Sequence, residues 1–111
     1  MNILISVQQP ELNSPVDERF GRAACFLLVN TETLGWEALE NVGSNNRGGA
    51  GIAAAQLAAD KNVTTVISGD FGPNATAALE AAGIQMIRFP RQGLTGKDVV
   101  ELFQQGTLTE S

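Results

Sequence analysis

Short apolar runs, separated by polar segments that contain proline and glycine, divide the first half of the chain into candidate strands. Asn2–Val7 is rich in branched residues and predicts a buried strand. Cys25–Asn30 predicts a second strand, and Trp36–Val42 alternates apolar and polar residues as a half-buried strand does. The turn Thr31–Gly35 between them ends in a glycine that can adopt a positive φ. We therefore expect the second and third strands to form a hairpin.

The next part of the chain alternates helices with strands. Ala50–Asp60 is rich in alanine, which predicts a helix whose small side chains let it lie close to a sheet. A strand over Val63–Ser68 follows. Pro73 occupies the expected first position of a second helix, where its missing N–H is not needed, and Gly83 ends that helix. Ile84–Phe89 then predicts a fifth strand.

A third helix is predicted near the end of the chain. Thr95 and Asp98 have the spacing of a capping box, which marks a helix start. The apolar positions that follow share one helical stripe, and they are Val99, Leu102 and Phe103. A polar tail over residues 106–111 is expected to be mobile. The order is therefore β-β-β-α-β-α-β-α, an α/β fold with a mixed five-stranded sheet, an initial antiparallel meander and three covering helices.

Length and charge exclude several functional classes. The chain has 111 residues, 7 Lys and Arg, 12 Asp and Glu, and a formal net charge of −5. This length suits one domain, which we assign to residues 1–105. Sequence-independent nucleic-acid binding is excluded because it needs clustered cations. The apolar runs fall far short of the roughly 20 residues that cross a bilayer, and the first residues lack the basic segment of a signal peptide.

The content of cysteine and histidine limits the chemistry further. Cys25 is the only cysteine and histidine is absent, so the usual multi-ligand zinc and iron–sulfur sites and the Ser-His-Asp and Cys-His catalytic arrangements are excluded. A single cysteine cannot form an internal disulfide, which favours a reducing cytoplasm. We expect Cys25 to be a small buried apolar residue. Any cofactor must then be held by shape, backbone N–H groups and charge.

Two glycine-containing loops open predicted helices at the carboxyl ends of strands, where ligands of such sheets tend to bind. The first is Gly48–Gly51 and the second is Gly69–Asn74. Free N–H groups and the helix dipole favour an anion there, and glycine lets a ligand approach the backbone. The simpler interpretation of each loop is a tight turn whose glycine adopts a positive φ.

Three arginines lie in the loops expected to flank this edge: Arg19, Arg22 and Arg47. A single exposed arginine is usually a solvated charge, so their shared location is the informative observation. Phe20 and Phe71 are interpreted either as core residues or as walls of an apolar pocket, with the core favoured for Phe20. The adjacent acids Asp17 and Glu18 are interpreted as solvated loop residues rather than a catalytic pair.

A second interpretation of the first glycine loop is nucleotide binding. Gly49–Ala54 fits the pattern G-x-G-x-x-A, and Asp70 follows at a distance typical of a dinucleotide fingerprint. The preceding segment is a polar hairpin strand and a loop, however, rather than a buried strand that leads directly into the glycines. The match alone is therefore weak.

Several motifs together resemble the dinitrogenase iron–molybdenum cofactor biosynthesis family. The segments that carry the resemblance are Ser14–Ala23, Phe26–Val29, Gly49–Ala54, Ile67–Ala75 and Leu79–Ile84. They extend over nearly the whole chain. The resemblance implies a ribonuclease H-like fold and a role in binding or carrying a preformed, anionic metal–sulfur cluster. The family includes nitrogenase accessory factors and the orange protein, which holds a molybdenum–copper sulfide cluster.

One position departs from the family pattern. Many relatives have histidine before the Phe-Gly-Arg element, where this chain has Arg19. Imidazole ligation is therefore impossible, and a self-contained thiometallate fits better than the iron–molybdenum cofactor. The ribonuclease H-like fold also occurs in nucleases, whose metals need several carboxylates. Asn2–Gln9 contains no acid, so we set nuclease activity aside.

The resulting hypothesis is a non-enzymatic carrier that holds a molybdenum-containing cluster non-covalently, together with a partner protein in cofactor assembly or delivery. No catalytic residue and no metal ligand is assigned. The candidate cofactor-binding residues are Arg19, Phe20, Arg22, Arg47, Gly49, Gly51, Gly69, Phe71, Gly72 and Asn74. Two alternatives remain open: a module that docks on a metalloenzyme without holding a cofactor, and a nucleotide-binding domain.

Overall fold

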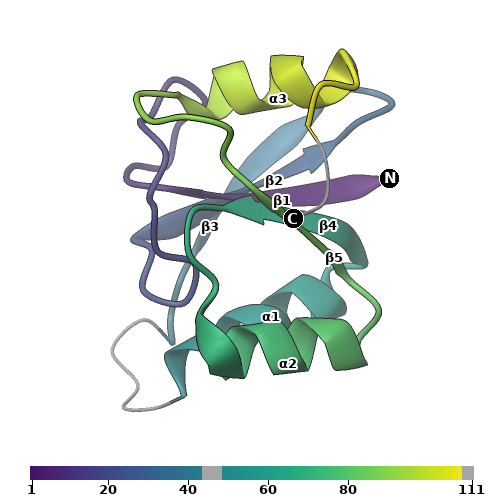
Figure 1. Cartoon of the computed structure of the whole chain (residues 1–111). Coiled ribbons are helices and arrows are strands. Elements are labelled where there is room, and N and C mark those ends of the chain that lie inside the picture. The colour runs from purple at the N-terminus through teal and green to yellow at the C-terminus, as the bar shows by residue number, and fades with distance from the viewer. Residues whose placement is uncertain (44–48, 109–111) are drawn as a thin grey trace.

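The computed structural model describes residues 1–43 and 49–108 and contains a single sheet with helices on both faces. Helices α1 and α2 lie side by side on one face, and α3 covers the other (Figure 1). The elements in chain order are β1 (Asn2–Val7), β2 (Cys25–Asn30), β3 (Trp36–Glu40), α1 (Ala50–Asp60), β4 (Val63–Ser68), α2 (Gly72–Ala81), β5 (Gln85–Arg88) and α3 (Gly96–Gln104).

The sheet has the strand order β3-β2-β1-β4-β5, with β1 at its centre. β1 pairs antiparallel with β2, and β2 pairs antiparallel with β3. β4 pairs parallel with both β1 and β5. The predicted five-stranded mixed sheet, its initial meander and the ribonuclease H-like element order are therefore confirmed. The parallel strands β1, β4 and β5 place their carboxyl ends at one edge of the sheet.

Both faces of the central strand are buried, which explains its unbroken apolar sequence. Leu4 packs in the core under α1 and α2, whereas its neighbours Ile3 and Ile5 pack in the core under α3. The alanines of α1 keep the helix close to the sheet, and Ala54 and Ala58 are both buried. Two hydrophobic cores thus form from one strand, one on each side of the sheet.

Some element ends differ from the predictions by one or two residues. α2 begins at Gly72 instead of Pro73, β3 ends at Glu40 instead of Val42, and β5 is confined to Gln85–Arg88. Val42 is exposed, so no packing holds it in a strand. Residues 106 and 107 cap α3 through Gly106 N and Thr107 N, which donate to carbonyl groups of its last turn.

The turn between β2 and β3 also differs in detail. The positive φ falls on Leu34, at 63°, rather than on Gly35. The side chain of Asn30 explains the shift, because its Oδ1 accepts hydrogen bonds from Glu32 N and Thr33 N. Such an Asx turn curls the chain early, and Leu34 N then donates to the Asn30 carbonyl oxygen at 2.8 Å.

The predicted capping box is present at the start of α3, and it gives a test of local stability. Thr95 Oγ1 accepts from Asp98 N at 3.1 Å, and Asp98 Oδ2 accepts from Thr95 N at 3.0 Å. Thr95→Ala should lower the free energy of unfolding by about 1 kcal/mol in urea denaturation. Thr95→Ser keeps the hydroxyl and should lose clearly less. Equal losses in the two variants would show that the hydroxyl does not stabilise the helix.

Burial of the Cys25 side chain at the start of β2 gives a second test. The residue is 6% exposed, and its Sγ lies 3.7 Å from the Val7 carbonyl oxygen. Burial raises the pKa of the Cys25 thiol, and the carboxylate of Asp17 raises it further. The folded state therefore keeps the thiol proton at a pH at which the unfolded chain begins to lose it. This contribution to stability is complete below the ordinary thiol pKa and declines as the pH rises towards the folded pKa.

The pH dependence of alkylation by iodoacetamide measures this shift directly. The midpoint for the native protein should lie above the midpoint for the same protein in urea. Coincident midpoints would contradict a raised thiol pKa, whatever the absolute rates.

Candidate functional site

A pocket of about 250 Å³ lies at the carboxyl end of β4, beside the first turns of α1 and α2. One wall comes from residues 16–24, here named the arginine loop. Within that loop Arg19, Phe20, Gly21 and Arg22 line the pocket. The remaining lining residues are Ala50, Gly51, Asp70, Phe71, Gly72, Pro73, Asn74 and Ala75.

Backbone hydrogen bonds hold the arginine loop along the end of the sheet. Asp17 N donates to the Ser6 carbonyl oxygen at 2.9 Å, which ties the loop to β1. Asp70 N donates to the Glu18 carbonyl oxygen at 2.6 Å, and Phe20 N donates to the Asp70 carbonyl oxygen at 2.9 Å. The loop therefore extends the sheet beside the chain that leaves β4, and the residues next to Arg19 have fixed backbone positions.

Three glycines permit the close approach of the segments that build the pocket. A Cβ atom at Gly69 would lie 2.8 Å from the Glu18 carbonyl oxygen. At Gly21 it would lie 2.8 Å from Gly51 N, and at Gly51 it would lie 3.0 Å from Ala75 Cβ. Since real Cβ atoms avoid such distances, the loop, α1 and α2 could not meet here with larger residues.

The first turn of α2 faces the pocket. Gly72 has a φ of 74°, a conformation that favours glycine, and its N–H donates to Asp70 Oδ1 at 3.2 Å. Pro73 and Asn74 follow in the pocket lining. The N-cap residue Phe71 has no side chain that could cap the helix. The positive end of the α2 dipole is therefore directed towards the pocket, where it favours an anion.

Charge and apolar surface meet in the same pocket. Among the described residues of the lining, Arg19 and Arg22 are exposed cations and Asp70 is the one that carries a carboxylate. Phe20 is fully buried, as expected for a core residue, and its ring centroid lies 5.5 Å from that of Phe71. The two rings pack against each other in the core, and the exposed Pro73 adds apolar surface to the pocket lining. A soft anion with a weakly hydrated surface suits this combination.

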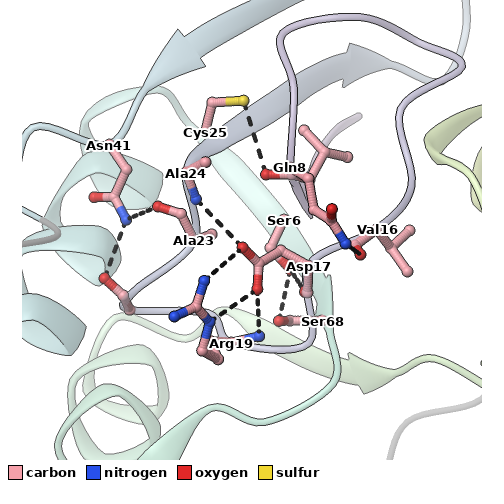
Figure 2. A network of polar contacts seen from close by, with 12 residues as sticks. Ser6, Gln8, Val16, Asp17, Arg19, Ala23, Ala24, Cys25, Asn41 and Ser68 are labelled. Atoms are coloured by element: carbon pink, nitrogen blue, oxygen red, sulfur yellow. Dashed lines mark hydrogen bonds and ion pairs between the residues drawn. The ribbon is translucent and has the colours of Figure 1, made fainter.

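The sequence interpretation missed the contacts by which Asp17 holds the arginine loop. The prediction of a solvated loop acid is wrong, because the Asp17 side chain is only 7% exposed. Its carboxylate accepts from the backbone N of Arg19 at 3.0 Å and from Ala24 N at 3.4 Å (Figure 2). It also pairs with the Arg19 guanidinium, and this hydrogen bond and charge raise the pKa of Arg19. The Asp-x-Arg spacing between buried Val16 and Phe20 is the signal that could have indicated the pair.

Asn41 also holds the arginine loop, and nothing in the alternating pattern around it indicated this. It is buried, and its Nδ2 donates to the Gly21 carbonyl oxygen at 3.0 Å and to the Ala23 carbonyl oxygen at 2.9 Å (Figure 2). The amide thus fixes the part of the loop that carries Arg22. Asp17 and Asn41 hold the two ends of the segment that lines the pocket.

The structure brings most of the predicted site residues together. Those that line the pocket are Arg19, Phe20, Arg22, Gly51, Phe71, Gly72 and Asn74. Gly69 instead lies against the Glu18 backbone, which gives it a structural role. Gly49 is the N-cap of α1 and is not in the lining, and Arg47 lies outside the described residues.

The described part of the chain offers no strong metal site and no spanning helix. Over residues 1–43 and 49–108, no three or more Cys, Asp or Glu side chains gather closely enough to hold a metal ion. Within the same ranges, none of the helices has the length and apolar character needed to cross a membrane. Cys25 lines a separate pocket with Ala38 and Leu39 rather than the one beside α2.

Comparison with known proteins gives a consistent result. The family profile described as dinitrogenase iron–molybdenum cofactor matches residues 1–106. The apo form of the orange protein from Desulfovibrio gigas is 36% identical, with a TM-score of 0.93 over 99% of this chain and 92% of that one. A NifB-like protein from Thermotoga is 31% identical, with a TM-score of 0.84 over 98% and 91% of the two chains.

A further relative matches at the level of the amino-acid sequence. An uncharacterised protein of Methanocaldococcus jannaschii is 28% identical over 108 residues, which is 95% of this chain and 90% of that protein. The profile match spans almost the whole sequence, and the structural matches extend to both halves of the sheet. The chain therefore belongs to the dinitrogenase iron–molybdenum cofactor family.

Proposed function

We propose that the pocket beside the arginine loop holds a preformed, anionic, molybdenum-containing metal–sulfur cluster, and that the protein is a binding or carrier protein rather than an enzyme. The observation that carries this proposal is the combination of two arginines and the start of α2 around one pocket that apolar residues also line. Family membership supports the class of guest.

The donors of this pocket suit a guest that already has its own ligands. Arg19 and Arg22 supply N–H groups and positive charge, and the first turn of α2 adds backbone dipoles. Pro73 and the edge of the largely buried Phe71 supply apolar surface for sulfide, which is a soft and weak acceptor. The volume of about 250 Å³ corresponds to roughly eight water molecules, enough room for a small thiometallate unit.

Among molybdenum clusters, this chemistry favours a molybdenum–copper sulfide over the iron–molybdenum cofactor type. The chain has no histidine, and Cys25 is buried in a different part of the fold. Neither an imidazole nor a thiolate is therefore available at the pocket to complete the coordination of a metal that lacks ligands. A thiometallate whose metals are fully coordinated by sulfide needs only non-covalent contacts. A protein that supplies or receives the cluster is part of the same proposal.

The nucleotide-binding alternative lacks the strand-to-helix junction that it requires. β3 is an edge strand that ends at Glu40, whereas α1 begins at Ala50. The G-x-G-x-x-A segment therefore does not follow directly from a buried strand, as a dinucleotide fingerprint does. The docking-module alternative makes a different prediction, namely that the protein binds a partner while taking up no cluster.

Titration of the metal-free protein with tetrathiomolybdate, with and without Cu(I), tests the carrier proposal. The wild type should give a coloured complex of fixed stoichiometry. Arg22→Ala should weaken retention about tenfold, because a hydrogen bond from a charged group is lost. Its unfolding curve should stay close to wild type, since Arg22 is exposed.

Arg91→Ala is the matched control, because Arg91 is also exposed but does not line the pocket. It should bind the cluster as the wild type does. Equal weakening in the two variants would mean that only overall charge matters. If neither thiomolybdate with copper nor an iron–sulfur precursor binds the wild type, the carrier proposal fails. Heat released on addition of ATP or NAD would instead favour the nucleotide alternative.

A further inference from the structure

Asp17 is absent from the pocket lining, yet its carboxylate contacts Arg19, which is part of it. We infer that Asp17 is a positioning residue that fixes the Arg19 guanidinium with one edge directed away from the carboxylate and available to an anionic guest. The availability of that edge matters only if the pocket binds an anion, so this part of the inference rests on the proposed function.

The contact between the two side chains is a two-point fork. Arg19 Nε donates to Asp17 Oδ1 at 3.2 Å, and Arg19 Nη2 donates to Asp17 Oδ2 at 3.2 Å (Figure 2). Such a fork fixes the plane of the guanidinium as well as its position. Of the five N–H donors of an arginine, about three remain on the outer edge. The two hydrogen bonds to Asp17 therefore fix the direction in which the remaining N–H groups point.

The carboxylate is the fixed partner of the pair. The side chain of Asp17 is 7% exposed, whereas that of Arg19 is 65% exposed. The Asp17 backbone is bonded to Ser6 through its N–H, and its carbonyl oxygen accepts from Ser6 Oγ at 2.7 Å. Ser6 Oγ also lies 2.7 Å from Ser68 Oγ across the pairing of β1 and β4. A continuous path of contacts thus joins the centre of the sheet to the guanidinium.

Asp17 carries a negative charge, which by itself would repel an anionic guest. The Asp17 carboxylate accepts hydrogen bonds from Arg19 and from Ala24 N, which offset its charge. Asp17 is also not among the residues that line the pocket. An exposed arginine without such a partner would lose conformational freedom when the guest binds. That loss weakens the affinity for the guest by about 2- to 13-fold. We therefore expect the gain from orientation to exceed the repulsion.

NMR of the cluster-free protein tests the positioning directly, without any ligand. The Arg19 Nε–H resonance, assigned by its loss in Arg19→Lys, should exchange slowly with water in the wild type. In Asp17→Asn it should exchange as fast as the exposed Arg91 Nε–H. Equal exchange of the Arg19 and Arg91 groups in the wild type would overturn the inference.

A double-mutant cycle with tetrathiomolybdate tests the consequence for binding. Asp17→Asn should weaken binding about 2- to 13-fold in the wild-type background. In the Arg19→Ala background the same change should have less than about a twofold effect. Glu18→Gln is the matched control, since it removes the neighbouring, exposed negative charge and should not weaken binding. Arg19→Lys keeps the positive charge but cannot form the two-point fork, so it should weaken binding to a similar extent. This variant keeps the test available if Asp17→Asn does not fold.

Each remaining outcome of the cycle is decisive. Tighter binding by Asp17→Asn would show that Asp17 acts only as a repelling charge. Equal weakening with and without Arg19 would show that Asp17 acts through the fold, a role that thermal unfolding would register as well. If the wild type binds no thiomolybdate, the proposed function fails, while the NMR result still decides whether Asp17 fixes Arg19.

Discussion

The close approach of the arginine loop to the end of the sheet is the constraint on which the pocket depends. The loop backbone lies against Gly69, and Gly21 lies against the start of α1 at Gly51. These contacts leave no room for a Cβ atom, so the loop could not lie this close to the sheet and to α1 if larger residues replaced these glycines. Buried Asp17 and Asn41 then satisfy its polar groups at both ends. The packing and hydrogen bonds of the folded protein therefore hold the pocket residues in place before any guest binds.

Under the proposed function, this constraint explains how a chain without histidine can present a site for an anion. Arginines on a mobile loop would lose conformational freedom on binding and would attract any counter-ion weakly. Here Arg19 is held by a buried carboxylate, and the start of α2 is fixed beside it through the bond between Gly72 N and Asp70. The pocket lining combines the two arginines and the start of α2 with apolar residues, Phe71 among them. Under the proposed function, such a pocket selects a guest by size, charge and softness, because the chain has no histidine and Cys25 lies in another pocket.

The fold could be predicted from the sequence because several local signals agree. The capping box at Thr95, the glycine at position 83 and the alanine-rich α1 each indicate an element that the structure contains. Parallel strands followed by helix starts also place the ends of the two predicted glycine loops at one edge, which is why Gly51 lies with Phe71 and Gly72 in one pocket.

The rest of the site depends on contacts between segments far apart in the chain, which local patterns do not report. Asp17 resembles a solvated loop acid until the fold buries it beside Ala24. Asn41 resembles the polar face of a strand, yet it bonds to residues about twenty positions earlier. Gly69 resembles a ligand-binding glycine but serves the approach of Glu18. In each case the role follows from the tertiary position of the arginine loop.

Crystallography of the thiomolybdate–copper complex, with anomalous scattering recorded at the molybdenum edge, tests the central claim most directly. The account predicts molybdenum between Arg19, Arg22 and the first turn of α2, with every protein atom beyond bonding distance of the metal. Molybdenum bonded to the sulfur of Cys25, or located away from the arginine loop, would contradict it.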